Sequence, residues 1–334
     1  FLKDSDDLSR ALSAGIDGDV RLDALTRRLY ATDASIYEIE PLGLILPRST
    51  QDVVHAVKIA AERNLSLLPR GAATSLAGQT VGESLHLDFS RHMSRILEID
   101  VQGRTARVEP GVVLDELNAT LAESGLMFGP DVSTSSRANL GGMIGNNSCG
   151  AHSIVHGKTI DHVVELTVVL ADGTITTLGP LRGDDEFTER CERPGIEGGA
   201  YREVRAVLDA YADDIDDNYP KVMRRVSGYN LDALRPPDPF DLSRLVVGSE
   251  GTLCVVVEAR IRLVDRPKHS VVMACHFDDL IDAMQANLLA VESRPAAVEL
   301  MDRVLMDQTR GQLEYEPRRR FLQGDPDALL CVEY

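Results

Sequence analysis

The pattern of apolar and polar positions divides this chain into short strands and amphipathic helices. Compact apolar or alternating runs predict strands at 42–46, 65–68, 85–89, 96–99, 106–108, 163–170, 174–178, 255–263, 269–276 and 329–332. Apolar residues at helical spacing predict helices after Ser49 and over 113–123, 201–211, 280–291 and 301–309. Residues 1–40 are polar with helical spacing and predict a helical lead-in. This mixture indicates an α+β protein.

Local signals sharpen several of these elements. Ser49 followed by Asp52 resembles a capping box, and Val53, Val54, Val57, Ala60 and Ala61 form the apolar face of the helix that it starts. Gly125 is placed to end the helix 113–123. The alternation in 85–89 predicts a strand with one solvated face. The strand 65–68 closes a βαβ-like unit, which brings the next loop to the end of a sheet where ligands usually bind.

The composition of the chain changes twice. Residues 183–244 are charged and helical, and we interpret them as an insertion that ends in a stiff Pro-rich loop. Residues 266–268 look like a boundary, after which a new unit begins. On the helix expected at 301–309, Arg303 with Glu299 and Asp302 predicts surface ion pairs.

Length and charge exclude several functions. The chain has 334 residues, of which 43% are hydrophobic, enough for two domains with real cores. The net charge of −18 argues against binding to nucleic acid or anionic lipid. No window approaches 18 uninterrupted apolar residues, so no transmembrane helix is expected. The five cysteines are scattered without a CxxC pair, which favours reduced cytoplasmic thiols and excludes an iron–sulfur cluster within this chain.

Three segments poor in bulky side chains are the candidate ligand-binding elements. They are 69–79, 139–150 and 247–253, and each lies beside an apolar run. The backbone N–H groups of Gly71 to Leu76, with the Thr74 and Ser75 hydroxyls, suit a diphosphate. One such loop can be an ordinary turn, but three together suggest one long ligand that is bound mainly by backbone.

Other ligand classes fit the residues poorly. Leu140 occupies the position of the first glycine of a dinucleotide fingerprint, which argues against a Rossmann NAD site. His152 occupies the position of the upstream glycine of a P-loop ending at Gly157-Lys158-Thr159. Cys149, His152, His156 and His162 have plausible metal spacing, but no carboxylate or second cysteine nearby completes a tetrahedron, so we expect no metal.

Three motifs carry a family resemblance. PRGAATSLAGQ, NLGGMIGNNSCGAHS with HGKTIDHV, and VVGSEGTL resemble the flavin-binding half of the vanillyl-alcohol oxidase / p-cresol methylhydroxylase family. Within it the chain resembles the D-2-hydroxyacid dehydrogenases for D-lactate, glycolate and D-2-hydroxyglutarate. The SGYNL stretch at 227–231 narrows this to large bacterial enzymes that are joined to an iron–sulfur module.

The resemblance implies a fold and the boundaries of its domains. It implies a two-subdomain p-cresol methylhydroxylase-type FAD-binding domain over 41–266, with subdomains at about 41–95 and 96–266. Residues 267–334 would be the first part of an α+β cap. Because the chain begins at Phe1 and has no signal-like start, we expect it to be a trimmed or fragmentary chain.

The resemblance also implies a set of FAD contacts. We expect them at Pro69, Arg70, Gly71, Ala72, Ala73, Thr74, Ser75, Leu76, Gly78, Gln79, Pro130, Asp131, Asn139, Gly141, Gly142, Ile144, Gly145, Asn146, Asn147, Gly150, Gly157, Val163, Glu250 and Gly251. Covalent relatives commonly carry histidine where Thr74 stands, so FAD is expected to be non-covalent. Taken without the resemblance, Glu250 reads equally well as a solvated carboxylate in a strand-entry turn.

The activity implied is oxidation of a D-2-hydroxyacid to the 2-oxoacid, by hydride transfer to flavin N5 while a base takes the hydroxyl proton. Arg224, Arg225 and Tyr229 are candidates for the substrate carboxylate, although a solvated basic helix end explains either arginine. No residue is a convincing base. The base, an iron–sulfur cluster and a zinc-type ion are expected only in parts outside this chain. An FAD oxidase that uses oxygen and a non-catalytic flavin-binding module remain alternatives.

The expected partners are a small 2-hydroxyacid and an iron–sulfur electron-transfer module. The expected location is the cytoplasm, or the inner membrane surface through the electron acceptor.

Overall fold

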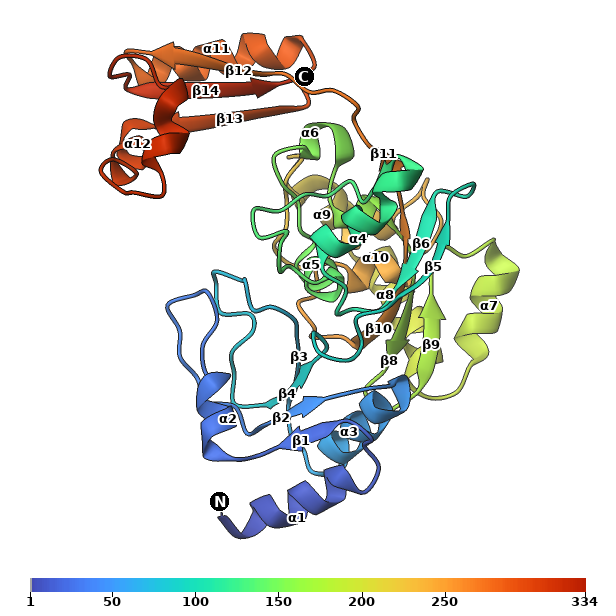
Figure 1. Cartoon of the computed structure of the whole chain (residues 1–334). Coiled ribbons are helices and arrows are strands. Elements are labelled where there is room, and N and C mark those ends of the chain that lie inside the picture. The colour runs from blue at the N-terminus through green and yellow to red at the C-terminus, as the bar shows by residue number, and fades with distance from the viewer. Residues whose placement is uncertain (1) are drawn as a thin grey trace. The chain divides into compact units, whose positions relative to one another are not determined.

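The computed structural model describes the chain from Leu2 to Tyr334, and it divides this chain into two units. The first unit runs to Phe128 and includes Val132–Ser148 and Lys158–Asp265. The second comprises Gly129–Asp131, Cys149–Gly157 and Arg266–Tyr334. Two short loops from the middle of the sequence therefore belong to the C-terminal unit. Figure 1 shows the elements of both units in chain order.

The N-terminal part of the first unit is a four-stranded sheet with the order β1-β2-β4-β3. Its strands are β1 Asp19–Arg21, β2 Gly43–Leu46, β3 Leu67–Arg70 and β4 Leu85–Asp88. β2, β4 and β3 are parallel, and β1 is antiparallel to β2. The accompanying helices are α1 Leu2–Ser13, α2 Ala24–Leu29 and α3 Thr50–Glu62. The predicted helical lead-in thus also contains a strand, because Asp19–Arg21 pairs with the exposed edge of β2.

Helix α3 begins as predicted, at Ser49, whose hydroxyl accepts a hydrogen bond from the N–H of Asp52 (3.3 Å). Its buried face includes Ala56 rather than Ala61, which is exposed. This face packs on β4 and also on Val169 and Val255, so α3 lies in one core cluster between the first sheet and strands of the second.

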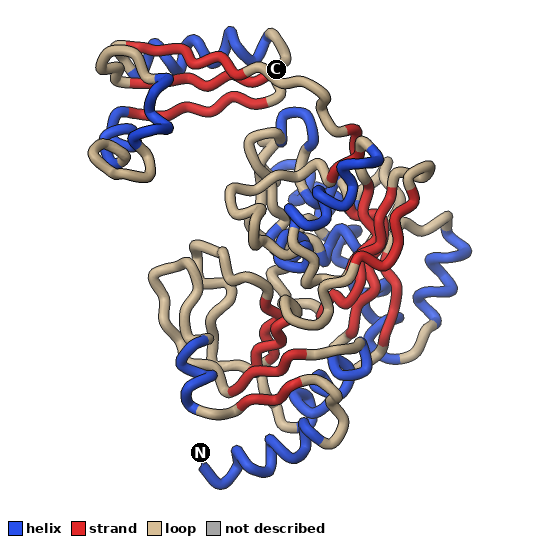
Figure 2. Tube along the Cα trace, in the orientation of Figure 1, coloured by secondary structure: helices blue, strands red, loops and turns tan. Residues whose placement is uncertain are grey.

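The solvated face expected for the strand 85–89 is wrong, because all four residues of β4 are buried. Figure 2 shows long tan loops that rise beside this sheet, and the hydroxyl of Tyr30, which directly follows α2, donates to Asp88 at 2.7 Å. Burial and the nearby charge of Arg70 lower the pKa of His86 to about 4, so its ring stays neutral.

The second sheet of this unit is antiparallel and has the order β5-β6-β10-β8-β9. Its strands are β5 Ile96–Asp100, β6 Thr105–Val108, β8 Val163–Val169, β9 Ile175–Leu178 and β10 Val255–Arg262. The predicted hairpins 96–108 and 163–178 are therefore confirmed. A small pair, β7 Leu126–Met127 and β11 Val264–Asp265, lies apart from this sheet in the hydrogen-bond pattern.

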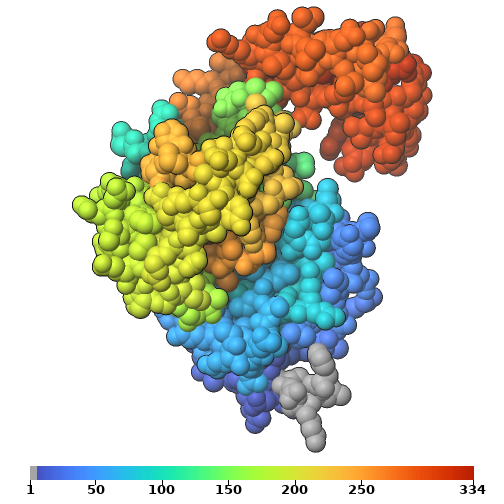
Figure 3. All heavy atoms as spheres, turned by 180° about the vertical axis from the view of Figure 1, so that it is seen from behind, coloured from blue at the N-terminus to red at the C-terminus, as the bar shows by residue number. Residues whose placement is uncertain are grey.

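Helices from the long connections share a core with this sheet. They are α4 Leu114–Leu121, α5 Leu140–Asn146, α7 Asp184–Glu192, α8 Gly195–Ala210, α9 Ala212–Asn218 and α10 Leu242–Val246, with 3₁₀ turns at Ala122–Ser124, Thr159–Asp161 and Leu231–Leu234. Gly125 ends the α4 region in the left-handed conformation, as predicted. The insertion 183–244 is helical, and in the view from behind it forms a continuous yellow-green to yellow surface (Figure 3).

The second unit contains a three-stranded antiparallel sheet with the order β12-β14-β13. Its elements are α6 Ser153–His156, β12 Val272–Phe277, α11 Leu280–Glu292, β13 Ala297–Asp302, α12 Arg303–Gln308, a 3₁₀ turn Glu316–Phe321 and β14 Ala328–Glu333. The helix expected at 301–309 starts two residues later, because Ala297–Asp302 pairs with β14. The α+β class is confirmed in both units.

Candidate functional site

One pocket in the first unit brings together the three segments that lack bulky side chains. Its volume is about 700 Å³ including the space that opens to solvent. Its lining residues are Pro69, Arg70, Gly71, Ser75, Gln79, Thr80, Phe89, Pro110, Gly141, Gly142, Gly145, Val246, Ser249, Glu250, Gly251, Cys254 and Val256. Segments that are about seventy to one hundred residues apart in sequence therefore form one site.

The first segment leaves the C-terminal end of β3, where parallel strands commonly present ligand loops. Within the described chain, no backbone N–H of residues 71–76 donates a hydrogen bond to another group of the protein. Ala73 has a φ of +56°, which turns this backbone sharply. Successive N–H groups that are left without protein acceptors are what an anionic ligand requires.

Arg70 holds the first segment in place. Its guanidinium donates to the carbonyl oxygens of Tyr30 (3.0 Å), Thr80 (2.8 Å) and Thr32 (2.7 Å). These bonds join loops 30–42 and 71–84 over the sheet. Burial lowers the pKa of Arg70, although the nearby carboxylate of Asp88 opposes this effect. The guanidinium is thus used for structure, and its charge remains beside the pocket.

The second segment forms the short helix α5, whose glycines face in different directions. A Cβ on Gly141 would lie 2.6 Å from Pro110 Cβ, whereas a Cβ on Gly142 would have no atom within 4 Å. Gly142 is exposed and lines the pocket. Gly141 therefore permits close packing inside the protein, and Gly142 leaves free space for a ligand.

The third segment is fastened to the end of α5. The N–H of Gly248 donates to Ile144 O and the N–H of Glu250 donates to Gly145 O, each at 2.9 Å. Asn146 Nδ2 donates to Glu250 Oε1 at 2.9 Å. Burial raises the pKa of Glu250, and its hydrogen bonds from Asn146 and Gln79 reduce this rise.

Ten of the residues predicted to contact a ligand line this pocket, and they come from all three segments. Other predicted residues of the first unit do not line the pocket and are held by contacts elsewhere. Ile144 is fully buried in the core. Asn139 Nδ2 donates to Gly111 O (2.7 Å), and Asn147 Oδ1 accepts from Ile160 N (3.0 Å). Val163 opens β8 and pairs with Ile261.

The remaining predicted contacts lie outside the pocket lining. Ala72, Ala73, Thr74, Leu76 and Gly78 belong to the first segment but do not line the pocket. Pro130, Asp131, Gly150 and Gly157 belong to the second unit. These assignments stay predictions.

The substrate-side candidates Arg225 and Tyr229 contact neighbouring side chains. Arg225 pairs with Asp232, and its guanidinium lies 4.7 Å from the centre of the Tyr219 ring. The Tyr229 hydroxyl is 2.8 Å from Thr252 Oγ1. Arg224 is exposed. The pairing of Arg225 makes it a less suitable carboxylate clamp than the sequence suggested.

Several residues that line the pocket were not predicted from the sequence; among them are Phe89, Pro110, Cys254 and Val256. Phe89 ends the predicted strand 85–89 and Pro110 comes two residues after the predicted strand 106–108, so the rule that sites lie at strand ends could have found them. Cys254 is half-buried, and the loss of solvent around its thiol raises the pKa to about 12 and keeps it protonated. A single cysteine before a strand gave no signal of its own.

In the second unit, His152, which was considered above as a metal ligand, lies close to two carboxylates. Its Nδ1 lies 3.0 Å from Asp131 Oδ2 and its Nε2 lies 3.3 Å from Glu333 Oε2. Burial by itself would lower the pKa of His152, but the two carboxylates outweigh it and the pKa is raised. Among the described residues no group of three or more His, Cys, Asp or Glu side chains could hold a metal ion.

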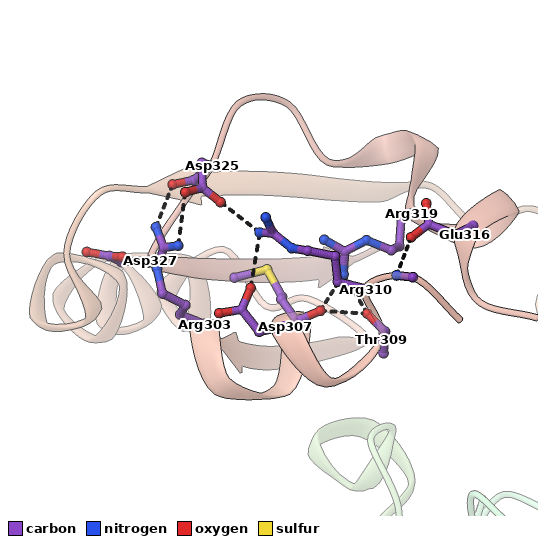
Figure 4. Close-up of polar contacts among 10 residues, drawn as sticks. Arg303, Asp307, Thr309, Arg310, Glu316, Arg319, Asp325 and Asp327 are labelled. Carbon is purple, nitrogen blue, oxygen red and sulfur yellow. Dashed lines mark hydrogen bonds and ion pairs between the residues drawn. The ribbon is translucent and has the colours of Figure 1, made fainter. Parts of the chain in front are cut away.

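The surface pairs expected around Arg303 form with different partners. Arg303 binds Asp325 Oδ2 (3.0 Å) and Asp327, and Arg310 binds Asp325 Oδ1 at 2.9 Å (Figure 4). Asp302 instead caps α12 by accepting from Leu305 N at 2.8 Å. This network connects α12 to the loop before β14, and because it is exposed we assign it no ligand.

No helix in the described part of the chain is long and apolar enough to cross a membrane.

Comparison with known proteins agrees with this architecture. Residues 41–179 match the family model of the FAD binding domain, and residues 266–334 match that of the C-terminal domain of FAD linked oxidases. Most of the chain therefore matches an FAD binding domain followed by the C-terminal domain of FAD linked oxidases.

Individual relatives point to one branch of this family. The chain is 35% identical over 320 residues to a D-2-hydroxyglutarate dehydrogenase of Pseudomonas putida. The aligned region covers 94% of this chain and 32% of the relative. It is 37% identical over 319 residues to a D-2-hydroxyglutarate dehydrogenase of Pantoea ananatis, covering 94% and 31%. The chain thus spans about a third of the length of these relatives.

A solved structure of an alkyldihydroxyacetonephosphate synthase shares the fold, with a TM-score of 0.69 at 19% identity. The structural alignment covers 98% of this chain and 56% of the synthase chain.

The pocket fits the cofactor that the family implies. Its wall includes Gly71 and Ser75, from the segment 71–76 whose backbone N–H groups have no protein acceptors and could serve a diphosphate. The pocket also offers free space at Gly142, and an adjoining apolar hollow, of about 630 Å³ including space open to solvent, shares Pro69, Gly251 and Cys254 with it. Backbone donors beside apolar walls suit a ligand that carries both a diphosphate and flat rings. The FAD expected from the sequence is therefore supported by both the residues and the relatives.

Proposed function

We propose that this chain is the flavin-binding part of a dehydrogenase that oxidises a D-2-hydroxyacid, of the D-2-hydroxyglutarate or D-lactate type. The observation that carries the proposal is the single pocket formed by the three glycine-rich segments. The names of the relatives, D-2-hydroxyglutarate dehydrogenases, supply the substrate class. Bound FAD supplies a two-electron acceptor for the hydrogen on the substrate carbon.

The residues of the chain have separable roles in this proposal. The N–H groups of 71–76 bind the diphosphate without a cation. Arg70 fixes that loop by its three carbonyl contacts and leaves a positive charge nearby. Gly142 allows the ligand to approach α5, and Glu250 with Asn146 holds the third segment against that helix. Binding by backbone atoms gives a site that is fixed before the ligand arrives.

Further parts of the proposal rest on the family resemblance. FAD is non-covalent because Thr74 cannot bond to the flavin as an imidazole does. The proton acceptor for the substrate hydroxyl, and the partner that receives the electrons, an iron–sulfur module, lie outside this chain. The corresponding location is the cytoplasm or, through that partner, the inner membrane surface.

Anaerobic titration of the FAD-loaded protein with D-2-hydroxyacids tests the activity. Bleaching of the flavin absorbance by D-2-hydroxyglutarate or D-lactate, and not by the L-isomers, is the expected result for the protein that contains its remaining domains. Flavin that binds but is never reduced by any hydroxyacid in that protein would contradict the dehydrogenase assignment. Steady peroxide formation in air would favour an oxidase instead.

A further inference from the structure

The side chain of Glu250 is a carboxyl group in the pocket wall that has amide partners and no cation. In the described chain the carboxyl group accepts a hydrogen bond from Asn146 Nδ2 at 2.9 Å, and the Gln79 side chain, which lines the same pocket, lowers its pKa. Gln79 belongs to the first segment, Asn146 ends α5 and Glu250 lies in the third segment. The carboxyl group thus bonds the third segment to the second, and it lies in the pocket that all three segments form.

The backbone at Glu250 is held in a conformation that glycine adopts more easily. Its φ is +52°, between Gly248 at +86° and Gly251 at +73°. The bond from its N–H to Gly145 O fixes the position and keeps the carboxyl group in the pocket wall. Strain of this kind is typical of positions where a side chain serves a site.

The other titratable groups around Glu250 keep their charge under ordinary conditions. The segments 71–80 and 247–253 and helix α5 contain no titratable side chain besides Glu250 itself. Arg70 lines the same pocket as a permanent cation that is bonded to three carbonyls, and Cys254 stays protonated because the pKa of its thiol is about 12. Glu250, whose pKa is raised by burial, is therefore the lining group whose charge can respond to a bound anion.

FAD brings the negative charge of its diphosphate into the pocket where this carboxyl group lies. Two anions in a site of reduced polarity repel each other, and protonation of the carboxyl removes the repulsion. The neutral acid can still accept from Asn146 and keep the second and third segments joined.

We propose that Glu250 takes up a proton when FAD binds, and so makes cofactor affinity depend on pH. This inference rests on the proposed FAD binding in the same pocket. The proton comes from solvent and is released again when FAD dissociates. Glu250 is thus a positioning residue for the cofactor, with a titration that is linked to binding.

Calorimetric titration of the flavin-free chain with FAD tests the proposal directly. The observed heat is compared in two buffers of different ionisation enthalpy at one pH, which counts the protons exchanged. We expect net uptake that approaches one proton per FAD bound. We also expect the Kd to rise by up to about tenfold per pH unit across the range between the pKa values of the free and bound states. Binding without proton exchange at any pH between about 5 and 8 would overturn the proposal.

A pair of variants assigns the proton to its site. Glu250→Gln keeps an amide oxygen for Asn146 but cannot titrate, so its Kd should be independent of pH and its proton uptake should vanish. Glu62→Gln removes an exposed carboxylate on α3, outside the pocket lining, and should behave as the parent chain does. Equal proton uptake in Glu250→Gln and the parent would overturn the assignment. FAD binding by neither protein would instead overturn the proposed function.

Discussion

Replacing Gly142 by alanine separates the stability of the chain from its affinity for FAD. Gly142 lies inside α5, and a Cβ there would meet no atom within 4 Å. Alanine in a helix interior is favoured over glycine by about 0.5–1 kcal/mol, so the flavin-free variant should melt about 1–3 °C higher. In the loaded protein the new methyl group occupies ligand space. An overpacking cost of about 1–3 kcal/mol corresponds to about 5- to 150-fold weaker FAD binding.

The assay is thermal unfolding of the flavin-free chain, followed by FAD titration monitored by flavin fluorescence. Gly199→Ala is the matched control, because it also lies in a helix with no atom within 4 Å of its added Cβ but is outside the pocket lining. It should gain stability and bind FAD normally. Gly141→Ala should lose stability, because its Cβ would collide with Pro110. Unchanged FAD affinity in Gly142→Ala would refute the placement of FAD against this face of α5.

Three further predictions concern stability and cofactor attachment. Asp52→Ala should lower the free energy of unfolding by about 3 kcal/mol, because the buried carboxylate accepts from three backbone N–H groups. A denaturant titration that gives a loss below about 1 kcal/mol would contradict the importance of these hydrogen bonds. The pKa of His152 is raised in the folded chain, because Asp131 and Glu333 outweigh the effect of burial. The pairing therefore contributes fully to the free energy of unfolding below the unfolded-state pKa of about 6.5, and this contribution declines as pH rises through the folded-state pKa. Unfolding measured against pH should show this decline in the parent and not in His152→Gln, and equal slopes would argue against the pairing. If Thr74 leaves FAD non-covalent, acid precipitation should release all of the flavin into the supernatant, whereas colour in the pellet would show a covalent bond.

Much of the fold follows from local signals in the sequence. Ser49 and Gly125 mark helix ends by their own chemistry, and the polar turn between 99 and 106 fixes a hairpin, so each could be predicted without tertiary information. The covered face of β4 could not, because His86 and Asp88 are polar and are buried only by loops from elsewhere in the chain. The strand at 297–302 was missed for a similar reason, since its pairing partner lies some thirty residues later.

The candidate site also combines features that could be predicted from the sequence with features that could not. Gly71, Gly142 and Gly251 could be recognised because the absence of side chains is visible in the sequence, and all three line the pocket. The role of Arg70 could not be recognised, since its carbonyl acceptors lie in loops that meet only in the folded chain. Likewise, nothing near Glu250 in the sequence indicates that Asn146 is its hydrogen-bond partner.

The central claim, that the three glycine-rich segments together bind FAD, is tested most directly by the visible absorbance spectrum of the purified chain before and after addition of FAD. A yellow protein whose flavin is released by acid is the predicted result. A colourless chain that also fails to take up added FAD would contradict the claim and return the three segments to ordinary turns.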